Sequence, residues 1–228
     1  MSDSDKRAAA EAAVQEVRSG MTVGLGTGST AYWAIEAIGR RVAAGEAISA
    51  VATSEASAAQ ARGLGITLLD MADVAAVDLT IDGADEIDPR LFAIKGAGGA
   101  MTREKIVATA SARMVVIADG SKRVEAIGAA PVPVEVLPFA QAFVAGRLEA
   151  LGAAVVRRQR DGGDYLTDGG NLVLDARFPS LPDPQELAAA LDGLPGVVGH
   201  GLFLSEVDAA YLAQGGVVTR LERPGGAA

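Results

Sequence analysis

The stretch MTVGLGTGSTAYWAIEAIGRRV, residues 21–42, changes its hydrophobic period once along its length. Met21–Leu25 is a short apolar run that ends in glycines, which is typical of a buried strand. After residues 26–30, large apolar side chains recur at helical spacing as far as Val42, and Gly45 closes the pattern. The stretch therefore predicts a strand, a glycine-rich turn and a helix.

The same alternation of strand and helix patterns continues to about residue 128. The further predicted strands are Ile48–Ala52, Ile66–Leu69, Val77–Ile81, Leu91–Ile94 and Met114–Ala118. The predicted helices are an amphipathic one within residues 1–20, then Thr53–Arg62 and Thr102–Ala112. Such alternation predicts an α/β fold with a mostly parallel open sheet and helices on both faces, a Rossmann-like arrangement.

The pattern changes near Gly128, where prolines become frequent. The elements expected from there are strands Val132–Val136, Ala153–Arg158, Tyr165–Thr167, Leu172–Leu174 and Val197–Leu204, and helices Phe139–Leu151 and Pro184–Leu191. Their order suggests a small ferredoxin-like α+β domain. A last hairpin, residues 211–221, is expected to return to the first sheet. We therefore predict a catalytic α/β domain of residues 1–128 and 206–228, with residues 129–205 inserted.

Composition excludes several classes of function. The net charge of −9 argues against nucleic acid as the main partner, because phosphate backbones need a basic surface. The absence of cysteine excludes thiolate nucleophiles and cysteine-ligated metals, and one histidine, His200, excludes a histidine-rich metal site. No segment is predicted to enter a membrane. We expect a soluble, cytoplasmic protein that binds a small molecule.

Five polar clusters each follow a predicted strand. They are residues 26–30, 53–57, 82–86, 95–99 and 119–122. The carboxyl ends of parallel strands meet at one edge of a sheet, and ligands of open α/β sheets bind at that edge. The clusters therefore predict a shared binding site.

The glycine-rich cluster at residues 26–30 suits phosphate. Free backbone N–H groups, the following helix dipole and hydroxyl side chains can all donate to an anion there. The alternative is a tight turn with Thr30 as a helix cap. The glycine spacing does not match the dinucleotide fingerprint, and the chain contains no Gly-Lys pair, which excludes a P-loop.

The cluster at residues 82–88 holds four acids. Asp82 and Asp85 flank a Gly-Ala turn and are the candidates for chemistry, whereas Glu86 and Asp88 are expected to cap or face solvent. The alternatives are a solvated acidic loop, which is the commoner fate of such a run, and a calcium loop, whose EF-hand spacing is absent.

Two lysines and one acid complete the candidate site. Lys95 precedes a glycine run and could be a cation fixed beside backbone that approaches a ligand; the alternative is a surface lysine. Glu104 lies in the first turn of a predicted helix, where an acid also suits the dipole without any catalytic role. Lys122 could be a phosphate ligand or part of an ordinary turn, and His200 is expected to be a packed side chain.

With these motifs assembled, the chain resembles ribose-5-phosphate isomerases of the A type over nearly its whole length. The matching motifs are Gly26–Thr30, Asp82–Ile87, Lys95–Gly99, Thr102–Lys105, Asp119–Lys122, Pro133–Val136, Asn171–Asp175 and Pro195–Val198. One departure is visible after Lys95, where the chain has Gly-Ala-Gly-Gly-Ala and many members have Gly-Gly-Gly-Ala-Ala.

The resemblance implies interconversion of ribose 5-phosphate and ribulose 5-phosphate in the pentose phosphate pathway, without metal or organic cofactor. It makes Glu104 the proton-transferring base, with Asp82, Asp85 and Lys95 as further catalytic candidates. The implied substrate-binding residues are Thr27, Gly28, Ser29, Thr30, Asp82, Gly83, Ala84, Asp85, Lys95, Gly96, Ala97, Gly98 and Lys122. We assign ring opening to Asp82 and stabilisation of the enediolate to Lys95 as hypotheses.

Two alternatives stay open at this point. One is a related sugar-phosphate enzyme, such as a deaminase or a lactonase. The other is a sugar-phosphate-binding regulatory module without turnover, although Asp82, Asp85, Lys95 and Glu104 are all present and no DNA-binding segment is evident. The resemblance also suggests a homodimer or homotetramer.

Overall fold

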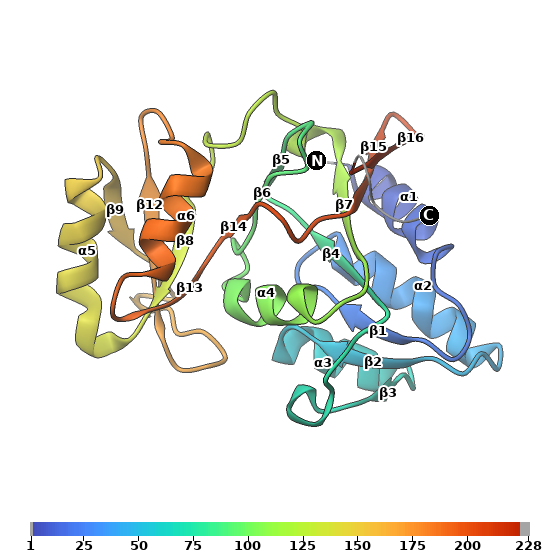
Figure 1. The fold of residues 1–228 in the computed structure, drawn as a ribbon. Helices are drawn as coiled ribbons and strands as arrows, with labels where there is room; N and C mark the ends of the chain where they lie inside the picture. Colours follow the sequence, from blue (N-terminus) through green and yellow to red (C-terminus); the bar gives the residue numbers. More distant parts are fainter. Residues whose placement is uncertain (1, 224–228) are drawn as a thin grey trace.

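The computed structural model describes residues 2–223 and contains a large, mostly parallel sheet (Figure 1). Its strands run in the order β16-β15-β7-β4-β1-β2-β3, and among the described pairs of neighbouring strands only β15 with β16 is antiparallel. The strands are β1 (Thr22–Leu25), β2 (Ser49–Ala52), β3 (Thr67–Leu68), β4 (Leu79–Gly83), β7 (Met114–Asp119), β15 (Ala209–Gln214) and β16 (Val217–Glu222). The predicted fold class is confirmed.

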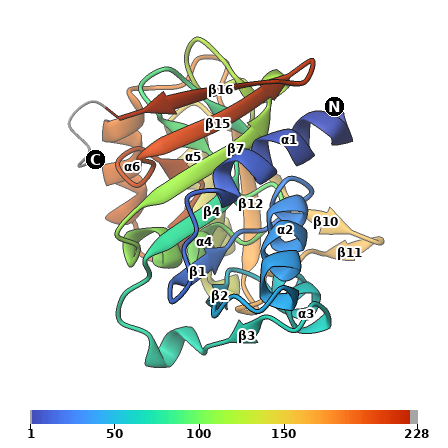
Figure 2. The same ribbon diagram turned by 90° about the vertical axis from the view of Figure 1, so that its right-hand side faces the viewer.

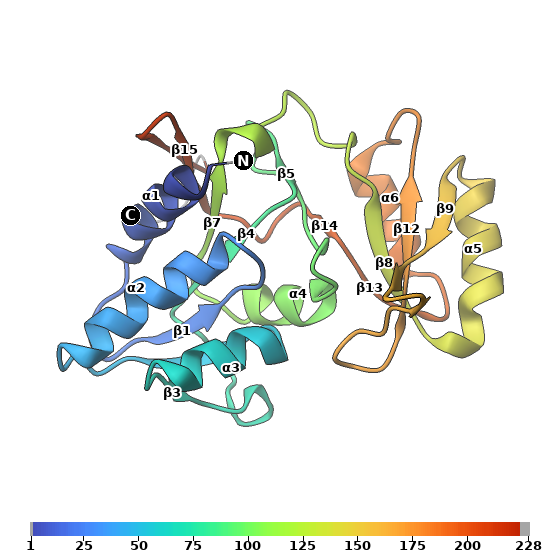
Figure 3. The same cartoon turned by 180° about the vertical axis from the view of Figure 1, so that it is seen from behind.

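Helices cover both faces of this sheet. Helices α1 (Asp3–Val14) and α2 (Ala31–Ala43) lie in front of the strands in Figure 2, with α3 (Glu55–Gly63) beside α2. Helix α4 (Met101–Thr109) lies on the opposite face (Figure 3). Every residue of β7 is buried, as expected for a strand covered on both sides.

The second sheet has the order β13-β8-β12-β9, and all its pairs are antiparallel. Its elements are β8 (Val132–Val136), α5 (Gln141–Ala150), β9 (Ala154–Arg157), β12 (Leu172–Arg177), α6 (Pro184–Asp192) and β13 (Val197–His200). This chain order and strand order are those of a ferredoxin-like unit. The unit has its own apolar cluster, in which Val134, Val144, Leu174 and Leu187 are buried.

A third, small sheet lies between the two larger ones. It pairs β14 (Leu202–Phe203), β6 (Ala93–Ile94) and β5 (Glu86–Ile87), all antiparallel. The strand predicted before Lys95 is therefore not part of the parallel sheet. The strand predicted at residues 197–204 is divided at Gly201 into β13 and β14. The Gly201 N–H donates to the carbonyl of Pro133, and the Gly201 carbonyl accepts the N–H of Lys95.

The strand predicted at Tyr165–Thr167 is wrong. The hairpin there consists of β10 (Gln159–Arg160) and β11 (Gly163–Asp164), and Leu166 forms only an isolated bridge with Leu172. Met1 and residues 224–228, which the predicted first domain includes, lie outside the described residues. Within residues 2–223, no helix is long and apolar enough to cross a membrane.

Candidate active site

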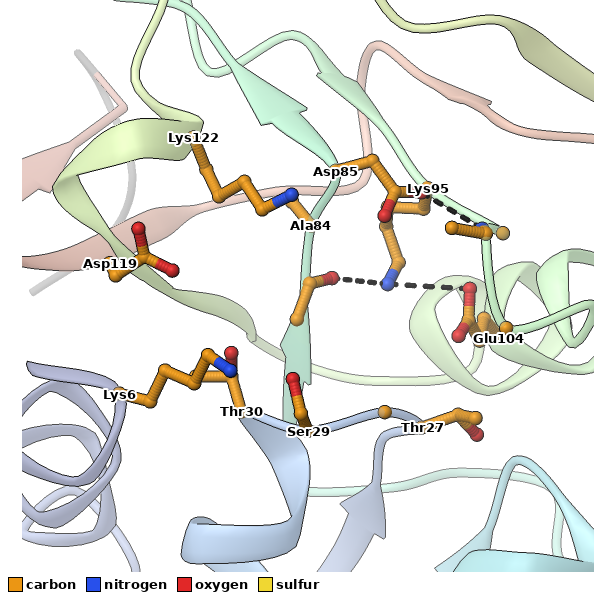
Figure 4. Close-up of a pocket in the computed structure, with 15 residues that line it drawn as sticks. Lys6, Thr27, Ser29, Thr30, Ala84, Asp85, Lys95, Glu104, Asp119 and Lys122 are labelled. Atoms are coloured by element: carbon orange, nitrogen blue, oxygen red, sulfur yellow. Dashed lines mark hydrogen bonds and ion pairs between the residues drawn. The ribbon is translucent and has the colours of Figure 1, made fainter. Parts of the chain in front are cut away.

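A cavity of about 230 Å³ lies at the carboxyl ends of β1, β4 and β7. Figure 4 shows Lys6, Thr30 and Lys122 toward one end of it and Lys95 and Glu104 toward the other. Its lining residues are Lys6, Thr27, Gly28, Ser29, Thr30, Gly83, Ala84, Asp85, Lys95, Gly96, Ala97, Gly98, Glu104, Asp119 and Lys122. All the candidate site residues from the sequence are among them except Asp82.

At the end of the cavity that Lys95 and Glu104 form, one lysine lies between two carboxyl groups. The Nζ atom of Lys95 is 2.9 Å from Asp82 Oδ2 and 3.3 Å from Glu104 Oε2, and it also donates to the Gly83 carbonyl. All three side chains are buried, with exposures of 2%, 0% and 3%. One buried cation cannot neutralise two buried carboxylates, so the cluster disfavours ionisation of both carboxyl groups at once.

This arrangement shifts the pKa of both wall groups. Burial alone would lower the pKa of Lys95, but the charges of Asp82 and Glu104 raise it by more, so the net shift is upward. Burial raises the pKa of Glu104, the charge of Asp82 raises it further, and Lys95 opposes both, with a result of about 8. Lys95 therefore keeps its proton, whereas Glu104 can take and return one near neutral pH.

Asp82 lies behind the cavity wall. The structure extends β4 through this residue, so its carboxylate sits inside the sheet edge and is not among the lining groups. Its Oδ1 accepts the backbone N–H groups of Thr27 at 2.9 Å and Gly83 at 2.7 Å. A Cβ atom at Gly26 would lie 2.1 Å from the same oxygen, so glycine is required for this close approach.

Asp85 lines the cavity and holds the neighbouring loop. Its Oδ2 accepts the N–H of Ala97 at 2.9 Å, and its own N–H donates to the carbonyl of Ile94. These two bonds join the loops that follow β4 and β6. They explain how two segments from different sheets form one wall.

The other end of the cavity combines positive charge with hydroxyl groups. Lys6 comes from α1 and Lys122 from the short 3-10 helix Gly120–Lys122, and both line the cavity together with Ser29 and Thr30 before α2. Ammonium groups, hydroxyls and a helix N-terminus are together suited to bind a phosphate.

Two cavity residues were missed as site residues in the sequence. Lys6 occupies the buried stripe of α1 together with Ala9, Ala10 and Ala13, so a charged residue at an apolar position was the available signal. Asp119 ends β7 and accepts the N–H of Ser121 at 3.0 Å. Its position at a strand end was recognised, but its place in the wall was not.

Glu86, Asp88 and His200 do not line the cavity, and their contacts stabilise the surrounding structure. Glu86 accepts the backbone N–H groups of Gly128 and Ala130, and Asp88 pairs with Arg90 at 2.7 Å. His200 is 1% exposed, and burial followed by the charge of Lys105 lowers its pKa to about 4. In the described part of the chain, no group of three acids, histidines or cysteines is placed to hold a metal ion.

Comparisons with known proteins agree with this geometry. A family model described as ribose 5-phosphate isomerase A (phosphoriboisomerase A) matches residues 49–216. A ribose-5-phosphate isomerase A of Sphingopyxis alaskensis is 53% identical over 94% of both chains. One from Roseiflexus sp. is 49% identical over 96% of both chains.

Solved structures give the same result. The ribose 5-phosphate isomerase of Plasmodium falciparum superimposes with a TM-score of 0.94 at 35% identity, covering 98% of this chain and 100% of its own. A D-ribose-5-phosphate isomerase in complex with phospho-erythronic acid has a TM-score of 0.94 at 34% identity, with 98% and 100% covered. The chain therefore belongs to the ribose 5-phosphate isomerase A family and is an isomerase that interconverts ribose 5-phosphate and ribulose 5-phosphate.

Proposed function

We propose that Glu104 carries the proton between C2 and C1 of the open-chain sugar phosphate. The supporting observation is a carboxyl in the cavity wall with a pKa of about 8, of which one oxygen, Oε2, is paired with the Lys95 ammonium at 3.3 Å. A carboxyl with this pKa can take the C2 proton and return it to C1 through a cis-enediolate near neutral pH. Positioned base catalysis of this kind contributes about 10²–10⁴ in rate.

Lys95 and the loop after it then stabilise the enediolate oxygens. The Lys95 ammonium is fixed at the cavity wall, and the adjacent loop residues Ala97 and Gly98 line the same wall. One preorganised donor aimed at a developing oxyanion is worth about 3–4 kcal/mol. We propose that phospho-erythronic acid also binds this cavity, because its carboxylate resembles the planar enediolate.

Asp82 is proposed to assist opening of the sugar ring. Since the carboxylate is behind the wall and 2.9 Å from the Nζ of Lys95, we propose that it acts through that lysine. The Lys95 ammonium, held in place by Asp82, would donate a hydrogen bond to the ring oxygen as the bond between C1 and that oxygen breaks, and the proton of the anomeric hydroxyl would pass to the ring oxygen.

This proposal for Asp82 predicts different effects on ring and open-chain substrates. Ribulose 5-phosphate cannot form a furanose, because its C5 hydroxyl is esterified, so it needs no ring opening. Asp82→Asn should slow conversion of ribose 5-phosphate at least about tenfold more than exchange of the C1 proton of ribulose 5-phosphate. NMR in D₂O measures the exchange. Equal losses in both assays would contradict a role in ring opening.

The phosphate is proposed to bind at the end of the cavity formed by Lys6, Lys122, Ser29 and Thr30. Removing either ammonium by Lys6→Met or Lys122→Met should raise KM about tenfold or more with a smaller change in kcat, because the reacting carbons are distant from this end. Initial-rate kinetics tests this, with Arg62→Met as a control outside the cavity. A normal KM in both variants would show that the phosphate lies elsewhere.

We also propose the domain division, location and assembly. Residues 1–128 with 206–228 and residues 129–205 form two domains, supported by the separate sheet and apolar cluster of the second. The enzyme is proposed to be cytoplasmic and a homodimer or homotetramer. Phe139, which is fully exposed, and Phe143, 54% exposed, supply an apolar contact surface. A monomer mass in analytical ultracentrifugation would contradict the assembly.

A further inference from the structure

The wall loop after Lys95 is bound by two side chains from the segment that joins β9 to β12 in the ferredoxin-like unit. Nη1 of Arg158 donates to the carbonyl of Gly96 at 2.9 Å and to that of Ala97 at 3.1 Å. The hydroxyl of Tyr165 donates to the carbonyl of Gly98 at 3.0 Å. Three successive carbonyl groups of a cavity-lining loop thus face two side chains of the ferredoxin-like unit.

These two side chains are themselves fixed. The Nε of Arg158 donates to Asp175 Oδ2 of β12 at 2.9 Å, and a second bond joins the same two side chains. The Arg158 N–H donates to the Val173 carbonyl, and its own carbonyl accepts the N–H of Tyr165. The guanidinium lies 5.7 Å from the tyrosine ring centre. Hydrogen bonds to β12 therefore hold Arg158 in place, and Arg158 in turn holds Tyr165.

The geometry of the peptide unit connects this binding to the cavity. In a trans peptide the C=O and the following N–H point in opposite directions. The unit that gives its Gly96 carbonyl to Arg158 gives its Ala97 N–H to the wall carboxylate of Asp85, at 2.9 Å. The next unit gives its Ala97 carbonyl to the same guanidinium, so the Gly98 N–H points away from Arg158. Within the described residues, no backbone carbonyl accepts a hydrogen bond from this N–H.

Gly99 shows how closely the loop and Tyr165 fit. Its φ is +81°, and a Cβ atom there would lie 2.1 Å from the tyrosine hydroxyl and 2.4 Å from two ring carbons. An alanine at this position would be strained in its backbone and would overlap the ring. Glycine at position 99, one of the two departures from the commoner family sequence, thus has a physical reason in this chain.

We propose that Arg158 and Tyr165 are positioning residues that hold the loop carbonyls outward, so that the Gly98 N–H faces the reacting oxygens. They touch the loop and do not line the cavity. The inference rests on the proposed role of this loop in stabilising the enediolate. It assigns the second sheet a part in catalysis, since the donor geometry on one wall is set from the ferredoxin-like unit.

The test compares Arg158→Met and Tyr165→Phe with the matched control Arg157→Met. Arg157 is the preceding residue, is 38% exposed and pairs with Asp164 at 3.0 Å, away from the loop. We expect Arg158→Met to lower kcat about 10²-fold, since one misplaced oxyanion donor costs that much. Tyr165→Phe, which loses one hydroxyl, should lower kcat about threefold to tenfold. KM should change less than about threefold, because the phosphate end is untouched.

Hydrogen exchange supplies a readout that general destabilisation does not reproduce. Deuterium uptake of the peptide covering residues 96–99 should increase in Arg158→Met and Tyr165→Phe and stay unchanged in Arg157→Met. If Arg158→Met does not fold, Tyr165→Phe alone tests the inference, because phenylalanine keeps the packed ring and removes only the hydroxyl. Wild-type kcat in Tyr165→Phe, or losses equal to those of the control, would overturn the inference. Failure of the proposed function is separate, since it would appear as turnover by a variant without Glu104.

Discussion

Replacing Glu104 with glutamine should abolish nearly all isomerase activity, with a fall in kcat on the order of 10⁴-fold and KM close to the wild-type value. The expected loss is at the upper end for a positioned base because the proposed mechanism uses one carboxyl at both carbon atoms. Glutamine keeps the size of the side chain in a site that is 3% exposed. A coupled assay of ribulose 5-phosphate formation measures the effect, with Glu149→Gln on α5 as a control remote from the cavity.

The same carboxyl should govern the pH dependence of the wild-type enzyme. With a pKa of about 8, Glu104 is protonated at lower pH and cannot act as a base, so kcat/KM falls about tenfold per pH unit below that value. The folded carboxyl binds its proton more tightly than the unfolded one, whose pKa is near 4.5. Its contribution to stability is therefore complete below pH 4.5 and is lost as the pH rises toward 8.

Glutamine does not titrate, so Glu104→Gln removes this pH-dependent loss of stability. Between pH 5 and pH 9, the melting temperature of the variant should therefore decrease by less than that of the wild type. This separates the variant's inactivity from any failure to fold. Substantial turnover by Glu104→Gln would eliminate this residue as the proton carrier.

Replacing Lys95 with methionine has the second large effect, and it acts on both rate and stability. The change leaves Asp82 and Glu104 buried without their shared cation. Breaking a buried pair in this way costs about 3–5 kcal/mol of stability, and loss of the proposed donor to the enediolate should lower kcat about 10²–10³-fold. Chemical denaturation measures the first quantity and steady-state kinetics the second.

The pH profile identifies the cause of the Lys95→Met defect. Without the ammonium, the pKa of Glu104 should rise further, so the variant's residual activity should increase toward higher pH than in the wild type. Lys95→Arg serves as the control that keeps the charge and changes the shape of the group. Wild-type kcat and stability in Lys95→Met would show that the ion pair is dispensable.

The sequence predicted most of the residues that line the cavity, because the carboxyl ends of parallel strands meet at one edge of a sheet. Gly26–Thr30 and the residues after β4 and β7 come from strands whose carboxyl ends share one edge, so their meeting follows from topology alone. Lys6 could not be placed in this way. It belongs to α1, which precedes the sheet, and its position depends on how that helix packs against α2 and β7.

The burial of Asp82 and the pairing of strands that are distant in the chain also could not be predicted from the sequence. The predicted strand ended at Ile81, so Asp82 was expected in a loop, whereas β4 continues through it and buries its side chain. Two-residue strands such as β6 have too little periodicity to show that they pair antiparallel with β14. The contact of Tyr165 with Gly98 depends on how the second unit packs against the loop, which no local pattern encodes.

The backbone bond between the Lys95 N–H and the Gly201 carbonyl has a consequence for biosynthesis. During synthesis the N-terminus leaves the ribosome first. Contacts between residues that are distant in the chain form late in folding, because a long loop must close first. When residues 1–128 have emerged, Lys95, Asp82 and Glu104 are present, but the strand that completes the small sheet around Lys95 is still unmade. We therefore expect a nascent or truncated chain that ends before residue 201 to have no isomerase activity, because β14 cannot pair with β6.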